Sequence, residues 1–192
     1  MAYTQRFDDA MVYAARMHIS QVRKGTSTPY IGHLLGVCSI TIEYGADEDE
    51  AIAALLHDGP EDQGGEVILT DIRVRFGDRV ADIVAGCSDT FEKPKPDWLI
   101  RKQRYIAHIP LAPVSTRFVS AADKLYNART ILSDTIRIGD LLWPRFTGGK
   151  TNTMWYYRAL VSAYVSAPDD RVNPLVDELN RVVTELERVV NG

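Results

Sequence analysis

The feature that most constrains this chain is an apolar segment that ends in a histidine and an aspartate. Residues 51–56 (AIAALL) are all apolar, and His57 and Asp58 follow directly. Such a segment is buried in a folded protein, and polar groups at its end need partners there. A divalent cation can serve both side chains at once. Because consecutive side chains on a helix diverge by about 100°, other parts of the chain have to bring the remaining ligands.

The spacing of apolar residues predicts an all-α fold. Apolar residues recur every three or four positions, and no stretch alternates convincingly as a half-buried strand does. Glycine and proline separate these stretches. The predicted helices cover residues 5–20, 30–44, 47–59, 70–76, 78–87, 98–109, 115–134, 151–166 and 174–190. Residues 90–97 are predicted to form an exposed loop and residues 138–150 an irregular segment. The 192 residues are enough for one sizeable core, so a single domain, 1–192, is expected.

Composition excludes several classes of protein. The net charge of −4 argues against a general nucleic-acid binder. The chain has no apolar run of about 20 residues, the length that a membrane helix needs, and its start lacks the apolar core of a signal peptide. Cys38 and Cys87 lie in apolar surroundings without a CxxC pair, which predicts buried free thiols in a reducing compartment. We therefore expect a cytoplasmic protein without a nucleic-acid or membrane partner, and a homo-oligomer stays open.

Two further residues are candidates to complete a metal site. His33 lies at the start of the predicted helix 30–44, and Asp123 lies inside the apolar stretch 118–125. With His57 and Asp58 they provide two imidazoles and two carboxylates. This mixture suits manganese, with iron, cobalt, nickel and zinc as alternatives. Such an ion lowers the pKa of bound water toward neutrality and so provides a hydroxide nucleophile.

Three motifs carry a resemblance to a known family. They are RKGT at 23–26 with PYIxH at 29–33, HDxxED at 57–62, and ADKLYNxR at 122–129. Their order and spacing resemble the HD-domain metal-dependent phosphohydrolases, specifically the hydrolase module of the RelA/SpoT alarmone enzymes in its short form, the small alarmone hydrolases. The HDxxED form separates this subgroup from the broad superfamily. One departure is Gly59-Pro60, where the family often carries apolar residues, and Pro60 is expected to end the helix.

The resemblance implies an HD-domain helical bundle, an activity and a set of site residues. By resemblance, His33, His57, Asp58 and Asp123 ligate one manganese ion, and Glu61 and Asp62 take the acid/base positions. The implied activity is removal of the 3′-pyrophosphate from (p)ppGpp, giving GDP or GTP and pyrophosphate. No synthetase, TGS or ACT segment is recognisable, so a stand-alone hydrolase is expected.

Contacts with the nucleotide substrate are predicted from residue type and position. Arg23 and Lys24 lie in a loop suited to hold a pyrophosphate. Asn127 lies four residues after Asp123 and so on the same helix face. The remaining predicted contacts would surround the site with positive charge and aromatic surface: Lys95, Lys102, Lys150 and Tyr156. His18 is predicted to be structural.

Two alternative functions stay open at this point. One is a phosphohydrolase of the same fold that acts on another nucleotide, such as NADPH. The other is a metal-bound regulatory module that binds a nucleotide without cleaving it. The intact Glu61-Asp62 pair speaks against the second alternative, because a sensor does not need both carboxylates.

Overall fold

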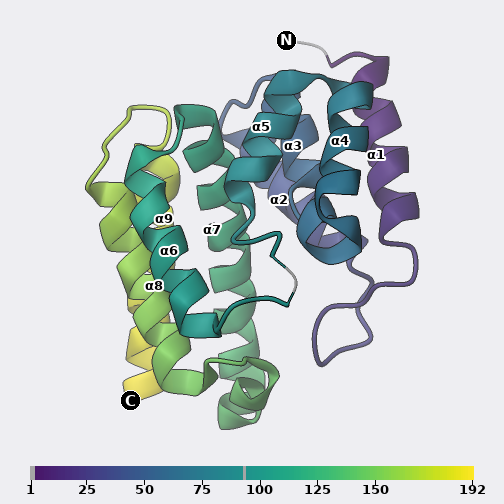
Figure 1. Cartoon of the computed structure of the whole chain (residues 1–192). Coiled ribbons are helices and arrows are strands. Elements are labelled where there is room, and N and C mark those ends of the chain that lie inside the picture. Colours follow the sequence, from purple (N-terminus) through teal and green to yellow (C-terminus); the bar gives the residue numbers. More distant parts are fainter. Residues whose placement is uncertain (1–2, 93) are drawn as a thin grey trace.

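The computed structural model describes residues 3–92 and 94–192 and is built from helices (Figure 1). The first group contains α1 (Gln5–Met17), α2 (Ile31–Glu43), α3 (Glu48–Leu56), α4 (Glu66–Phe76) and α5 (Asp78–Cys87). The second contains α6 (Trp98–His108), α7 (Val114–Ile138), α8 (Gly149–Val165) and α9 (Asn173–Asn191). Short helical segments connect neighbouring helices: η1 (Pro60–Gly64) between α3 and α4, η2 (Ile109–Leu111) between α6 and α7, and η3 (Gly139–Arg145) between α7 and α8. The described residues contain no β-strand, so the predicted all-α class is confirmed.

The long helix α7 lies between the first group and the other helices of the second group, as Figure 1 shows. It packs against α2, α3 and α5 on one side and against α8 and α9 on the other. Phe118, Ala122 and Leu125 on this helix are completely buried. Buried apolar residues from both groups form one continuous core around α7. Asp123, which lies among these residues, is therefore held in the middle of the fold.

Helix α3 buries the apolar segment and is fixed at its start by polar contacts. Residues 51–56 are 0% exposed, as expected for a helix that is apolar on all sides. The helix starts with a capping box, in which Asp47 and Glu50 each accept a hydrogen bond from the other's backbone N–H at 3.0 Å. Glu50 is also completely buried, and Arg171 donates to both of its carboxylate oxygens, at 3.0 and 2.6 Å. This ion pair ties the α8–α9 connection to the start of α3.

The structure differs from the sequence prediction at several helix boundaries. Helix α4 starts at Glu66 and not at residue 70, because Gly65 adopts φ +59° and lets the chain turn directly into a new helix. Helix α7 continues to Ile138. The segment predicted to be irregular, 138–150, contains the 3₁₀ helix η3. Local patterns alone place helix ends poorly, since packing and turn geometry decide them.

The loop between α1 and α2 is held by backbone contacts. Val22 and Pro29 form an isolated antiparallel bridge. The backbone N–H of Arg23 donates to the carbonyl of Thr28 at 2.8 Å. Gly25, at φ +71°, makes the turn. This hairpin-like loop gives Arg23 a defined position, which a flexible loop would not.

Two further predictions can be compared with the fold. Cys38 and Cys87 are both free; Cys38 is buried as predicted, and Cys87 is half-buried. None of the helices in the described part of the chain combines the length and the apolar character that crossing a membrane requires.

The close approach of α2 and α7 depends on a glycine. A Cβ added to Gly36 would lie 2.0 Å from Cε2 of Tyr126 on α7. The ring of Tyr126 in turn packs against the ring of His33, with centroids 5.1 Å apart. Any side chain at position 36 therefore displaces Tyr126 and disturbs the packing around His33.

We predict that Gly36→Ala destabilises the protein by about 1–3 kcal/mol, because the extra methyl group overpacks the α2–α7 contact. Gly32→Ala on the same helix is the control, since a Cβ there meets nothing within 4 Å. It should raise stability by about 0.5–1 kcal/mol through helix propensity. Urea unfolding of both variants measures the difference. Equal stability of the two variants would contradict the packing argument.

Candidate metal centre and substrate cleft

The four residues predicted as metal ligands converge at one point. His33 comes from α2, His57 and Asp58 directly follow α3, and Asp123 comes from α7. Nε2 of His33 lies 3.3 Å from Nε2 of His57, 3.1 Å from Oδ2 of Asp58 and 3.3 Å from Oδ1 of Asp123. Nε2 of His57 lies 3.1 Å and 3.6 Å from the same two oxygens. Both imidazoles are 2% exposed and Asp123 is 5% exposed.

The separations among His33, His57 and Asp58 fit ligands that share one divalent cation, and Oδ1 of Asp123 is a fourth candidate atom beside both imidazoles. Atoms about 2.1 Å from a common ion in tetrahedral or octahedral geometry lie roughly 3.0–3.4 Å from each other. Nδ1 of His57 is 2.8 Å from the carbonyl oxygen of Ala54, which can only accept, so Nδ1 carries a proton. Metal-binding histidines typically donate their second N–H in this way. Burial lowers the pKa of His57, but Asp58 and Asp123 outweigh it and raise that pKa well above its usual value, so metal binding has to release the proton of Nε2 before its lone pair faces the cluster.

The charges of the cluster also suit a cation. Burial opposes ionisation of Asp58, but the adjacent His57 and His33 outweigh it and hold the pKa of that carboxyl well below its usual range. Burial is likewise outweighed at Asp123, where Lys124 and the two imidazoles keep the pKa well below its usual range. Both carboxylates are therefore ionised at neutral pH, which is the form that binds a metal.

Three neighbouring side chains hold the two carboxylates. The hydroxyl of Tyr30 donates to Oδ2 of Asp58 at 2.6 Å. Nδ2 of Asn127 donates to Oδ1 of Asp123, and Nζ of Lys124 pairs with Oδ2 of Asp123, each at 2.6 Å. Outer contacts of this kind orient metal ligands. Asp123 therefore combines an ion pair to Lys124 with a place beside the two imidazoles.

Glu61 and Asp62 lie in η1, immediately after the cluster. This segment is a single π-helical turn, in which the N–H of Gly65 donates to the carbonyl of Pro60 at 2.7 Å. Turns of this type occur frequently at functional sites. The sequence predicted a helix end at Pro60, and the structure continues the helical path through one wider turn. This turn keeps both carboxylates beside the cluster.

Each of these acidic side chains has one polar partner among the described residues. Nζ of Lys95 lies 3.0 Å from Oε1 of Glu61. Nε2 of Gln21 donates to Oδ2 of Asp62 at 2.7 Å. The side chain of Asp62 is exposed, yet partial loss of solvent and the nearby Asp58 carboxylate raise its pKa. Asp62 and Glu61 therefore differ in electrostatic environment.

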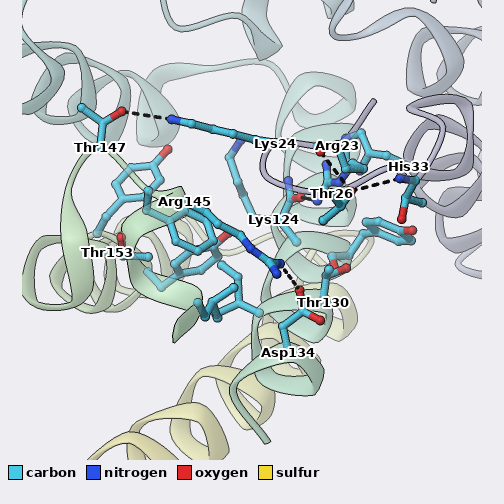
Figure 2. A pocket seen from close by; sticks show the side chains of 18 of the residues that line it. Arg23, Lys24, Thr26, His33, Lys124, Thr130, Asp134, Arg145, Thr147 and Thr153 are labelled. Atoms are coloured by element: carbon cyan, nitrogen blue, oxygen red, sulfur yellow. Dashed lines mark hydrogen bonds and ion pairs between the residues drawn. The ribbon is translucent and has the colours of Figure 1, made fainter. Parts of the chain in front are cut away.

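A cleft of about 540 Å³ opens beside the cluster (Figure 2). Tyr30 and His33 line one part of it, and Trp98 and Thr153 line another. Its described wall carries seven basic side chains: Arg23, Lys24, Arg101, Lys102, Lys124, Arg137 and Arg145. The acidic side chains in the same wall are Glu61 and Asp134. A protein of net charge −4 thus concentrates positive charge here, which favours a ligand with several phosphates.

Contacts around the cleft link the α1–α2 loop, α7 and the segment from η3 to α8. Nζ of Lys24 lies 3.3 Å from Oγ1 of Thr147, and Nη1 of Arg145 lies 3.0 Å from Oδ2 of Asp134 (Figure 2). Nη2 of Arg23 donates to Oδ1 of Asn127 at 2.7 Å. The α1–α2 loop is therefore held to α7 and to the segment between η3 and α8.

The structure separates the predicted substrate contacts into two sets. Those that line the cleft are Arg23, Lys24, Lys102, Asn127 and Tyr156. Lys95 does not line the described cleft wall but reaches the site through Glu61. Lys150 pairs with Asp140 at 3.0 Å and is also outside that wall, because the first turn of α8 faces η3. Direct contact of these side chains with a substrate stays a prediction.

Sequence reasoning missed several residues that line the cleft. Lys124 is adjacent to Asp123, and Tyr30 is part of the PYIxH motif, so both could have been found from their neighbours. Arg145, Arg101 and Tyr157 carry no such signal. They come from the 3₁₀ segment η3, α6 and α8, whose arrangement around α7 only the fold shows.

Comparison with known proteins identifies the class. Residues 10–138 match the family described as HD domain, and the protein belongs to this family. The chain is 38% identical over 126 residues to guanosine-3′,5′-bis(diphosphate) 3′-pyrophosphohydrolase MESH1 of Xenopus tropicalis, covering 64% of this chain and 68% of that protein. The human MESH1 protein is 36% identical over the same length, again covering 64% and 68% of the two chains.

Solved structures agree with this assignment. A structure of a metazoan SpoT orthologue described as hydrolysing ppGpp matches with a TM-score of 0.75 and 25% identity, covering 94% of this chain and 97% of that chain. The crystal structure of lmo0812 from Listeria monocytogenes matches with a TM-score of 0.70 and 30% identity, covering 84% and 99% of the two chains. The resemblance inferred from the motifs is therefore confirmed.

We predict that His57→Ala abolishes stable binding of one divalent cation. The loss in affinity should exceed the roughly 10- to 100-fold that removal of an outer partner costs. His108→Ala is the control, because His108 is exposed on α6 away from the cluster. Equilibrium dialysis against Mn²⁺ with metal analysis measures both variants. Unchanged Mn²⁺ binding by a folded His57→Ala protein would contradict the site.

Proposed function

We propose that this protein hydrolyses the 3′-pyrophosphate bond of (p)ppGpp, giving GDP or GTP and pyrophosphate. The observation that carries the proposal is the two-histidine, two-aspartate cluster, in which only Asp58 is half-buried, with Glu61 in the wall of the adjoining basic cleft and Asp62 next to Glu61. Similarity to proteins named as 3′-pyrophosphohydrolases supports the choice of substrate. The whole chain is proposed to act as one HD-type domain, which its continuous core supports.

His33, His57, Asp58 and Asp123 are proposed to hold the metal ion. We propose manganese, because two imidazoles with two carboxylates combine borderline and hard ligands. When bound, such an ion polarises phosphoryl oxygens and lowers the pKa of bound water, so that hydroxide is available as a nucleophile near neutral pH. The two free thiols support a reducing, cytoplasmic location.

Glu61 and Asp62 are proposed to handle the protons of the reaction. Hydrolysis requires removal of a proton from the attacking water and delivery of one to the leaving oxygen. The π-helical turn η1 holds both carboxyl groups directly after Asp58. Their different partners, Lys95 and Gln21, give the two groups distinct environments, which is how a site separates an acid from a base.

The basic cleft is proposed to bind the phosphates. Arg23 reaches from the hairpin-like loop to Asn127, and Asn127 in turn donates to Asp123. Movement of the loop is therefore coupled to a metal ligand by two hydrogen bonds. Lys124 also faces the cleft and neutralises the second oxygen of Asp123. Fixed positive groups of this kind stabilise charge that develops on a phosphoryl group.

We predict that the Mn²⁺-loaded protein releases pyrophosphate and GDP from ppGpp. Chromatography of the nucleotide products, with separate assays for pyrophosphate and orthophosphate, measures this. NADPH is included as a competing substrate. Release of orthophosphate alone, or no turnover of ppGpp with Mn²⁺ present, would reject the proposal, and turnover of NADPH alone would assign the cleft to that nucleotide.

We predict that Asp62→Asn lowers kcat on ppGpp by about 100-fold or more, because proton transfer contributes roughly 10²–10⁴-fold. Mn²⁺ content should not change, since Asp62 is not one of the four ligands. Asp170→Asn, an exposed position in the α8–α9 connection, is the matched control and should keep full activity. Full activity of Asp62→Asn would remove Asp62 from the reaction.

A further inference from the structure

We propose that Gln21 is a positioning residue that holds Asp62 for proton transfer and that His18 fixes the orientation of the Gln21 amide. The inference rests on the proposed catalytic role of Asp62. It assigns a role to His18 at the end of α1 and to Gln21 at the start of the following loop. The sequence by itself predicts only a structural role for His18.

A chain of hydrogen bonds joins the three residues. Nδ1 of His18 lies 2.7 Å from Oε1 of Gln21. Nε2 of Gln21 donates to Oδ2 of Asp62, also at 2.7 Å. Nε2 of Gln63, from the same π-helical turn as Asp62, donates to Oε1 of Gln21. The amide of Gln21 is therefore bonded at its oxygen by two groups and at its nitrogen by the carboxylate.

These partners allow a single orientation of the amide. With the oxygen toward His18 and Gln63, each contact pairs a donor with an acceptor, and the NH₂ group faces a carboxylate that can only accept. With the amide reversed, its oxygen would face the carboxylate of Asp62, and the two acceptors would repel each other. The network therefore presents a donor to Asp62 at a fixed place.

His18 has features that packing alone does not explain. It is 2% exposed, and its Nε2 has no hydrogen-bond partner in the described part of the chain. An apolar side chain in that place would avoid burying an unpaired polar atom. The imidazole also stacks on the ring of Tyr30, with centroids 5.3 Å apart and planes at 18°. Since Tyr30 donates to Asp58, His18 contacts the supports of both a proposed acid/base residue and a proposed metal ligand.

The side chain of Gln21 is not needed to shape its own loop. The loop is closed by the carbonyl oxygen of Gln21, which accepts from the backbone N–H of Tyr30 at 2.9 Å. Substitution of the side chain leaves that bond in place. Asp62, by contrast, is exposed, so without the Gln21 bond its carboxylate is free to rotate. The bond at Oδ2 restricts that rotation and leaves Oδ1 available to the reacting groups.

Two substitutions in the full-length, Mn²⁺-loaded protein test the inference with ppGpp as substrate. Gln21→Met has a similar length but no donor, and kcat should fall about 10- to 100-fold, as small misplacements of catalytic groups do. KM and Mn²⁺ content should stay unchanged. Gln21→Glu places a second carboxylate next to Asp62 and raises the pKa of the pair. The limb of the pH–kcat profile that Asp62 sets should then move to higher pH. Gln5→Glu, an exposed position on α1, is the control.

A double substitution tests whether His18 affects kcat by positioning Gln21 or only by stabilising the fold. If His18 acts through Gln21, then His18→Phe combined with Gln21→Met should lower kcat no further than Gln21→Met alone. Unchanged kcat and pH profile in both Gln21 variants would overturn the inference, as would a loss of activity that is matched by loss of Mn²⁺ or of thermal stability. Wild-type protein and Asp62→Asn are assayed in parallel. Failure of the wild type to cleave ppGpp would reject the proposed function, whereas a wild-type profile in Gln21→Glu would reject only the role of Gln21.

Discussion

The structure depends on a buried cluster of two imidazoles and two carboxylates. His33, His57, Asp58 and Asp123 approach within 3.1–3.6 Å of one another in the pairs that involve an imidazole. Removing such groups from water is costly unless they pair with each other or with a cation. Because they come from α2, the end of α3 and α7, any arrangement that satisfies them also fixes how these helices pack. The close contact of Gly36 with Tyr126 belongs to the same packing.

The site has a rigid part and a more exposed part, and the two are supported differently. The proposed metal ligands lie on or directly beside buried helices, so the core itself holds them. Glu61, which is half-buried in the cleft wall, and Asp62, which is exposed, lie in a π-helical turn, where burial does not fix both side chains. Hydrogen bonds from Lys95 to Glu61 and from Gln21 to Asp62 hold these side chains in place. The hairpin-like loop after α1 thereby supports the proposed chemistry through Gln21 and the substrate cleft through Arg23.

Much of this arrangement could be predicted from residue order. Apolar spacing identified the helices, and residues 57–62 and 122–129 indicated the proposed ligands and acid/base pair because their residue types and separations are unusual in apolar surroundings. Prediction was weaker where position depends on packing. Lys150 has the same charge as Lys102, yet it pairs with Asp140 outside the cleft wall while Lys102 lies in it. Arg145 was missed, because nothing near it in the sequence marks the cleft.

The sequence by itself determined the helical class, the apolar segment that must be buried, and the residue types able to hold a cation. These follow from local periodicity and from the cost of burying polar groups. Only the tertiary structure decided which lysine and arginine side chains surround the cleft and how Asp62 is held. Those properties depend on side-chain directions from elements far apart in the chain, such as Gln21 meeting Asp62 across 41 residues. Local spacing carries no information about such meetings, because the packing around α7 sets them.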